Sequence, residues 1–194
     1  MALPWPEALE PTDMVWGMVY NNRAFTSTLS NAQQIVGYPG AYWLCTLTFG
    51  VLFDEEEREL TALFGRLQGM AGTFNLPAFT RTRTDDIGRA VVVTGHAQAT
   101  TLTVGGVTAQ ARVFAMGDYI TIAGEMFEVV DDAVSNAQGQ ALLHLNKRIR
   151  RTLAVGAVVE YRHPYSEMRR TDDTHQLNLQ PVVANGSFQF REAF

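Results

Sequence analysis

The side chains that most often do chemistry are few and widely spaced in this sequence. Its histidines never lie within five residues of one another, so sequence neighbours cannot form a helical metal-binding pair; they are His96, His144, His163 and His175. The single cysteine, Cys45, has no partner for an intrachain disulfide and lies within an alternating apolar segment. We expect Cys45 to be a small buried hydrophobe, and we expect no metal ion and no cofactor.

Three acidic doublets have the ligand chemistry of hard cations: Asp85-Asp86, Asp131-Asp132 and Asp172-Asp173. Each lies in or beside an expected turn, where Asp is favoured because its carboxylate hydrogen-bonds the local backbone. None of them has the alternating ligands and fixed glycine of a calcium loop. The sequence also lacks a phosphate loop, a dinucleotide fingerprint and the nucleophile elbow of hydrolases. We therefore predict no catalytic residues and interpret the chain as a protein that is not an enzyme.

Basic residues form two local groups that are candidates for an interface. The denser group follows an expected strand and contains Lys147, Arg148, Arg150 and Arg151. Small barrels bind oligonucleotides or sugars through such loops, with aromatic side chains for stacking. The region offers few aromatics: Phe114, Tyr119, Phe127 and Tyr161. A solvated loop or a protein contact is therefore the favoured interpretation of this group.

The second basic group alternates with threonine, in Thr80-Arg81-Thr82-Arg83-Thr84. This pattern predicts an exposed ribbon with one charged face. Arg81 and Arg83 would then lie either on a solvated edge or on a strip of ion pairs between subunits.

Composition limits the remaining function classes. The chain has 194 residues, of which 46% are hydrophobic and 18% charged, which is typical of a folded protein. Its net charge of −5 lacks the broad attraction that a nucleic-acid-binding protein exerts on phosphates. The first residues do not resemble a signal peptide, and the longest apolar stretch is too short to span a bilayer. We expect a soluble protein made in the cytoplasm, with no membrane partner.

Most of the chain alternates with the period of two that is typical of strands. We predict one strand pair over residues 13–20 and 23–28, joined at Asn21-Asn22, and a second over residues 32–37 and 41–49, joined at Tyr38-Pro39-Gly40. A further strand is predicted over residues 72–76. Trp43 and Leu47 fall on the apolar face of the second pair and are assigned to the core.

One segment has the period of a helix. Asp54 is the expected N-cap and Glu57 completes a capping-box pattern, while Gly69 marks the C-terminal end. The spacing predicts a helix over residues 55–68 whose apolar stripe lies against the sheet; the stripe is Leu60, Leu63, Phe64 and Leu67.

From residue 95 to residue 164 the expected strands are short and separated by glycine-containing turns, which is typical of a small barrel or sandwich. The residues after 164 are too few for another domain, yet they contain strand-like sequence that needs a sheet partner. We therefore predict a mainly β fold: a β-sandwich with one flanking helix from residues 1–94 and 165–194, interrupted by an OB-like barrel at 95–164. Polar stretches at residues 80–89 and 166–173 would form the hinge.

Two sets of motifs in the sequence are similar to those of a known family. The N-terminal set is Phe25-Thr26-Ser27, residues 32–36, Pro39-Gly40, Trp43 and the Glu-rich helix that ends in Leu67-Gln68-Gly69. The later set is the runs GDYITIAG (117–124), FEVVDDA (127–133) and GQALL (139–143). Through these motifs the sequence resembles the distal tail proteins of tailed phages.

This resemblance implies a fold and a function. Distal tail proteins have a β-sandwich with a flanking helix, related to tail-tube proteins, and some carry an inserted OB-like barrel. Six copies form a ring between the tail tube above and the tail-tip or baseplate hub proteins below, with DNA passing through the lumen. The expected location is the virion, after synthesis in the host bacterial cytoplasm. A tail-tube, tail-terminator or other baseplate ring protein, or a carbohydrate- or nucleic-acid-binding module, remain the alternatives.

Overall fold

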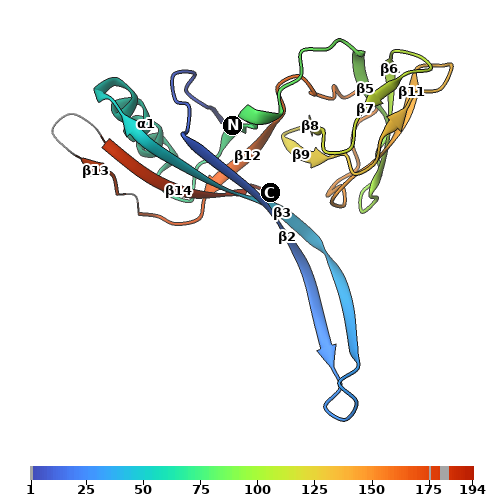
Figure 1. Ribbon diagram of the computed structural model, residues 1–194, viewed down its shortest axis with the longest axis horizontal. Helices are drawn as coiled ribbons and strands as arrows, with labels where there is room; N and C mark the ends of the chain where they lie inside the picture. Colours follow the sequence, from blue (N-terminus) through green and yellow to red (C-terminus); the bar gives the residue numbers. More distant parts are fainter. Residues whose placement is uncertain (1, 175, 180–183) are drawn as a thin grey trace. The chain divides into compact units, whose positions relative to one another are not determined.

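A computed structural model describes residues 2–174, 176–179 and 184–194 of the chain (Figure 1). The chain forms two compact units, each assembled from separate stretches of sequence. The first unit comprises Met1–Gly17, Trp43–Phe79 and Tyr165–Phe194, and the second comprises Met18–Tyr42 and Thr80–Pro164. The predicted fold class, mainly β with one flanking helix, is confirmed.

The first unit is built on a seven-stranded sheet with the strand order β1-β4-β12-β14-β3-β2, in which β13 pairs with β14. Its strands are β1 (Leu3–Pro4), β2 (Asp13–Thr26), β3 (Gln33–Leu52), β4 (Phe74–Pro77), β12 (Tyr165–Arg170), β13 (Asn178–Leu179) and β14 (Ala184–Glu192). The C-terminal strands β12 and β14 thus lie between N-terminal strands. The strand-like sequence expected after residue 164 includes residues 175–179, which lie partly outside the described residues.

Helix α1 (Asp54–Leu67) packs on this sheet through its apolar stripe. Leu60, Leu63, Phe64 and Leu67 are buried in one cluster with Trp5 and with strand residues that include Leu47 and Phe49, and Trp43 is buried as well. The ring of Phe64 meets that of Phe188 edge to face, at a centroid distance of 4.7 Å. This face of the sheet therefore holds the core of the first unit.

The cap of α1 lies one residue earlier than the sequence pattern predicts. Phe53 is the N-cap, and its backbone N–H donates to Glu56 Oε2 at 2.9 Å. Glu57 instead accepts a hydrogen bond from the Thr61 hydroxyl at 3.1 Å. Four consecutive acidic residues make the two registers equivalent as sequence patterns, so packing of the helix decides which carboxylate reaches the cap.

The hinge predicted over residues 166–173 is wrong, because most of this stretch is the interior strand β12. Ser166, Met168 and Arg170 point inward and are buried. The guanidinium carbon of Arg170 lies 4.7 Å from the centroid of the Phe64 ring, so the cation covers the core with its flat face. Polar residue types at inward positions hid the strand from a hydropathy-based prediction.

The two predicted N-terminal hairpins are in fact one long hairpin. β2 and β3 run through Asn21-Asn22 and Pro39-Gly40 without turning. β2 ends at Thr26, and the chain reverses after Ser27, in residues 28–32. The Asn21 side chain donates to the Pro39 carbonyl at 3.1 Å, so the residues expected to form two turns contact each other across the hairpin. Gly40 has a φ of 107°, which the strand absorbs as a local irregularity.

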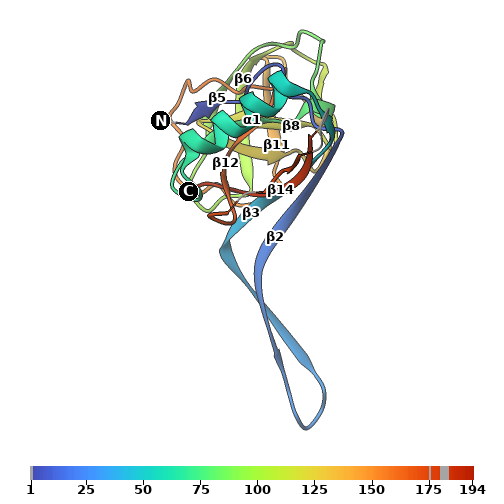
Figure 2. The same cartoon turned by 90° about the vertical axis from the view of Figure 1, so that its left-hand side faces the viewer.

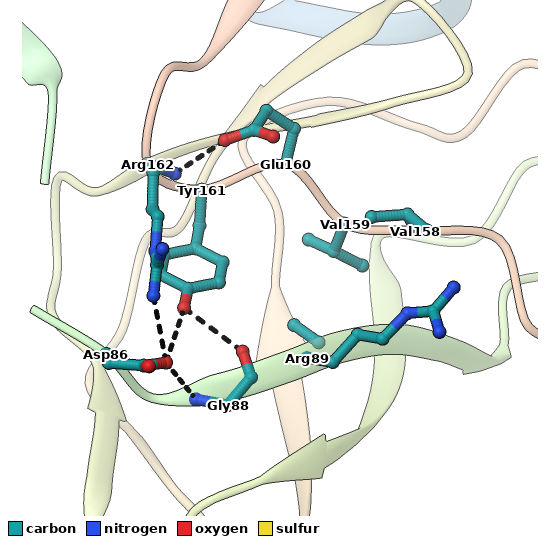
Figure 3. Close-up of a pocket in the computed structure, with 9 residues that line it drawn as sticks. Asp86, Gly88, Arg89, Val158, Val159, Glu160, Tyr161 and Arg162 are labelled. Carbon is teal, nitrogen blue, oxygen red and sulfur yellow. Dashed lines mark hydrogen bonds and ion pairs between the residues drawn. The ribbon is translucent and has the colours of Figure 1, made fainter.

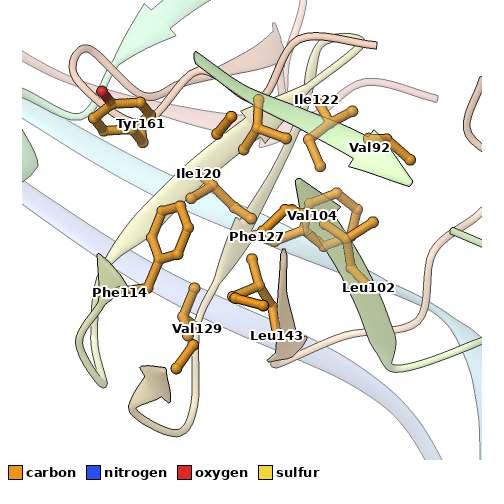
Figure 4. Close-up of a cluster of buried hydrophobic side chains, with 14 of the residues drawn as sticks. Val92, Leu102, Val104, Phe114, Ile120, Ile122, Phe127, Val129, Leu143 and Tyr161 are labelled. Atoms are coloured by element: carbon orange, nitrogen blue, oxygen red, sulfur yellow. The ribbon is translucent and has the colours of Figure 1, made fainter. Parts of the chain in front are cut away.

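The second unit contains short strands around its own core (Figure 4). They are β5 (Gly88–Thr94), β6 (Thr101–Val107), β7 (Arg112–Phe114), β8 (Tyr119–Ile122), β9 (Glu125–Glu128), β10 (Ala133–Val134) and β11 (Gln140–His144). The core residues include Val92, Leu102, Phe114, Ile120 and Phe127.

The described strands of the second unit form no closed barrel, which corrects the expected barrel closure. They pair as the separate ladders β11-β6-β5, β7-β10 and β8-β9. Register shifts interrupt the pairings of β5 and β10. The inserted part of this unit starts at Thr80, earlier than residue 95, because β5 belongs to it, and the unit also includes Met18–Tyr42. Gly105-Gly106, an expected turn, lies within β6.

Candidate interaction surface

The outer part of the β2–β3 hairpin, Met18–Tyr42, is the most exposed segment of the described chain and is called the arm below. Every residue from 20 to 35 is exposed. The arm is a two-stranded ribbon that ends in a loop (Figure 1, Figure 2). The side chains exposed there include large apolar ones: Tyr20, Phe25, Leu29, Ile35 and Tyr38.

The arm has two open backbone edges. Among the residues that the structure describes, β2 is the last strand of the sheet, and its outer edge has no strand partner. β14 pairs with β3 only between Leu44 and Leu52, so the outer stretch of β3 has β2 as its one neighbour. Two strands alone are marginally stable in water, because each residue fixed gains few hydrogen bonds and little burial. The arm is therefore a surface that gains stability from a partner.

The arm also lacks the usual protection of an exposed edge. Arg23 is its one charged residue. Proteins normally protect free edges with charged side chains, above all Lys, or with proline, and here only Arg23 and Pro39 serve in this way. Low charge together with exposed aromatic and aliphatic side chains is typical of surfaces that bind a partner.

Local hydrogen bonds define the tip of the arm. The Ser27 N–H donates to Ala32 O at 2.9 Å, and the Asn31 N–H donates to Ser27 O at 3.0 Å. Asn31 takes a left-handed φ of 53°, which Asn tolerates well. Leu29 stands at the turn with 98% of its surface exposed. The cluster Ser27-Thr28-Leu29-Ser30-Asn31 was the sequence signal for this turn, and it was overlooked in favour of the Asn-Asn and Pro-Gly pairs.

The first basic group divides between the interior and the surface. Lys147 is fully buried, with its Nζ 3.4 Å from Glu125 Oε1 and 5.0 Å from the centroid of the Phe127 ring. Arg150 is half-buried, and its Nη1 lies 3.7 Å from the same Glu125 oxygen. Arg148 and Arg151 are exposed. Only these last two therefore present free cationic surface of the kind the sequence interpretation required.

The second basic group is not a ribbon. Arg81 ends the 3-10 helix η1 (Phe79–Arg81), and the residues that follow have no strand pairing. The guanidinium carbon of Arg81 lies 5.2 Å from the centroid of the Tyr119 ring. Arg83 is directed into its own unit, where Nη1 donates to Asp118 Oδ2 at 2.7 Å and to Val113 O at 3.1 Å. Arg83 thus fastens this linker to the unit and is not an edge residue.

A shallow pocket of about 370 Å³ lies between the start of β5 and residues 158–162 (Figure 3). Its polar groups bind one another. Tyr161 Oη donates to Gly88 O at 3.0 Å, and Arg162 Nη2 lies 3.0 Å from Asp86 Oδ1. The pKa of Asp86 is lowered from 3.8, first by the Gly88 N–H and then by Arg162. Because Asp86 and Arg162 already bind each other, the pocket offers an incoming ligand little polar recognition beyond the side chain of Arg89.

The three acidic doublets make turn and ion-pair contacts. Asp85 bonds Arg83, Asp132 Oδ1 accepts the Met116 N–H at 2.9 Å, and Asp173 Oδ1 accepts the Met70 N–H at 3.0 Å. Within the described residues, no group of three or more His, Cys, Asp or Glu side chains is arranged to hold a metal ion. His96, His144 and His163 are exposed, and His175 lies outside the described residues.

The aromatic side chains of the second unit's later region are all interior. Phe114, Tyr119, Phe127 and Tyr161 are buried. Stacking on bases or sugars needs an exposed ring face. The described surface of this region therefore has no aromatic platform, whereas the arm exposes Tyr20, Phe25 and Tyr38.

The sequence matches no protein-family model and no curated protein. Among the helices in the described part of the chain, none is long and apolar enough to cross a membrane.

Proposed function

We propose that this chain is a structural virion protein of a long-tailed phage, which assembles into a ring at the distal end of the tail tube and connects the tube to tail-tip or baseplate proteins. The proposal is supported by the sequence resemblance described above. The observation that carries it in the structure is the arm: an exposed, nearly uncharged ribbon with two open edges.

The chemistry of the arm favours a protein partner. Its open edges present backbone N–H and C=O groups that another strand can pair with. A membrane is a poor partner for the same surface, because hydrocarbon would leave these groups without hydrogen bonds.

A second copy of the chain suits the arm because the two open edges belong to different strands. The outer edge of β2 in one copy can pair with the outer stretch of β3 in the next copy. Such a contact is head-to-tail, and repeated contacts of this kind close into a ring when the rotation between copies fits. A homohexamer is the ring size that the family resemblance implies. In the virion, the tail tube and the hub proteins would contact the two sides of this ring.

The exact station in the tail is not distinguished by these features. A tail-tube, tail-terminator or other baseplate ring protein would use the same kind of arm. The binding-module alternative has less support, since the second unit's later aromatics are buried.

Negative-stain electron microscopy of the purified chain tests the proposal. We expect rings with a central hole and six-fold symmetry at high protein concentration, together with single copies at low concentration. Single copies at all concentrations, with no ring in tail preparations labelled by an antibody to the chain, would overturn the proposal.

A further inference from the structure

We propose that a buried ion-pair cluster in the second unit is a positioning device for the arm. The cluster consists of Glu125, Lys147 and Arg150. It holds the segment of residues 146–150 in place, and this segment in turn binds both strands of the arm at its base. The inference concerns the single chain, so it holds whether or not the arms assemble into a ring.

Two hydrogen bonds join the segment to the arm. Tyr20 of β2 donates its hydroxyl to Asn146 O at 3.3 Å. Arg150 Nη2 donates to Ala41 O of β3 at 3.2 Å. Ala41 lies beyond Leu44, where the ladder between β3 and β14 ends, so the guanidinium binds β3 just beyond its pairing with β14. One short segment thus contacts each strand of the arm where the arm begins.

Both ends of strand β9 (Glu125–Glu128) contact the segment of residues 146–150. At one end, the Glu128 N–H donates to Asn146 Oδ1 at 3.1 Å and the Asn146 N–H donates to Glu128 O at 3.0 Å. At the other end, Glu125 Oε1 lies 3.4 Å from Lys147 Nζ and 3.7 Å from Arg150 Nη1. The carboxylate therefore fixes the guanidinium that binds the arm.

Burying the charges of this cluster costs free energy, and this cost argues that the cluster has a positional role. The side chain of Lys147 is 0% exposed and that of Glu125 8% exposed, and taking such charges out of water offsets much of their attraction. Replacing a buried ion pair by well-packed apolar residues of similar size is often neutral or stabilising in proteins. What apolar residues cannot do is orient a guanidinium toward a backbone carbonyl. The chain places its one lysine here, although its other 14 basic residues are arginines.

Spin-label distance measurements test the proposal on the full chain. Labels are placed at Thr28→Cys on the arm tip and Gln138→Cys on the second unit, both at exposed positions. Cys45 is buried and takes no label in the folded chain. A large excess of unlabelled chain removes distances between copies. We expect one narrow distance distribution for the parent chain, and a broad one when Arg150→Met and Tyr20→Phe are combined.

The matched control is Arg148→Met, which removes an exposed arginine two residues from Arg150. It should leave the distribution narrow. Glu125→Gln combined with Lys147→Met removes the buried charges as a pair, so the unit should stay folded, as circular dichroism would show, while the distribution broadens. The proposal is overturned if the Arg150→Met/Tyr20→Phe chain keeps the parent distribution, or if Arg148→Met broadens it equally.

Discussion

Pro77 and Tyr165 are paired in the antiparallel ladder between β4 and β12, although residues 78–164 separate them in the sequence. The chain therefore leaves the first unit after β4 and returns to it in β12, at positions that pair with each other. An insertion whose ends meet in this way adds little strain to the host sheet.

This pairing predicts that the inserted stretch is dispensable for the first unit. Replacing residues 80–164 by a short Gly/Ser turn should leave the seven-stranded sheet folded, because closing a loop costs free energy that grows only slowly with loop length. Amide dispersion in NMR spectra of the shortened chain is the measurement. Collapsed dispersion would show that the two units share one core.

The stripe of α1 predicts specific losses of stability. Leu63→Ala and Phe64→Ala should each lower the free energy of unfolding by about 2–5 kcal/mol, since each leaves a cavity under the helix. Arg58→Ala, on the exposed side of the same helix, is the control and should change it by less than about 0.5 kcal/mol. Denaturant titration measures both. Equal effects of Leu63→Ala and Arg58→Ala would contradict the packing described.

Arg83 should stabilise the second unit. Arg83→Met removes its hydrogen bonds to Asp118 and Val113 and should cost about 1.5–3 kcal/mol, the range for hydrogen bonds to charged groups. Arg89→Gln, an exposed arginine of the neighbouring β5, is the matched control. Thermal unfolding midpoints of the two variants are compared with that of the parent chain. Midpoints equal to the parent's in both variants would refute this role for Arg83.

The same side chain predicts a shift in a neighbouring pKa. The pKa of Asp85 is held below 3.8, mainly by the hydrogen bond from Arg83. The stabilisation linked to this carboxylate is therefore present above the unfolded-state pKa and lost as the pH falls through the lower folded-state pKa. Arg83→Met should raise the Asp85 pKa toward its ordinary value, which NMR titration of the side-chain carboxyl carbon would show. An Asp85 pKa that is the same in Arg83→Met and in the parent chain would mean that Arg83 does not lower the pKa of Asp85.

Cys45 should be unreactive in the folded chain. Burial raises the pKa of its thiol to about 12, so the reactive thiolate is rare at neutral pH and also shielded from reagents. A chromogenic disulfide should label it only after unfolding, whereas an added Thr28→Cys on the arm tip should react at once. Equal rates for the two thiols in native buffer would place Cys45 at the surface.

The sequence was a good guide where one rule decides the structure. Apolar spacing at residues 60, 63, 64 and 67 was sufficient to predict α1 to within a residue at each end. Likewise, the excess of strand-like sequence after residue 164 correctly indicated strands that join an N-terminal sheet. Both inferences rest on local pattern and chain length, which the sequence contains.

The failures occurred where distant residues decide the structure. Asn21 and Pro39 suggested turns, but each contacts the other across the hairpin, and only the paired structure shows this. Arg170 was expected within a polar hinge and Lys147 in a solvated loop or a protein contact, yet one lies over Phe64 and the other pairs with Glu125. Phe64 and Glu125 are far from these cations in the sequence, so the local pattern carried no sign of them.

The claim that the arm is the surface through which copies associate is tested most directly by sedimentation velocity. The parent chain is compared with Ile35→Asp/Tyr38→Asp, which adds charge to exposed arm positions without touching either core. We predict that the parent forms a discrete larger species as concentration rises, whereas the variant stays a single copy with an unchanged unfolding midpoint. Identical sedimentation of the two chains at every concentration would contradict the account.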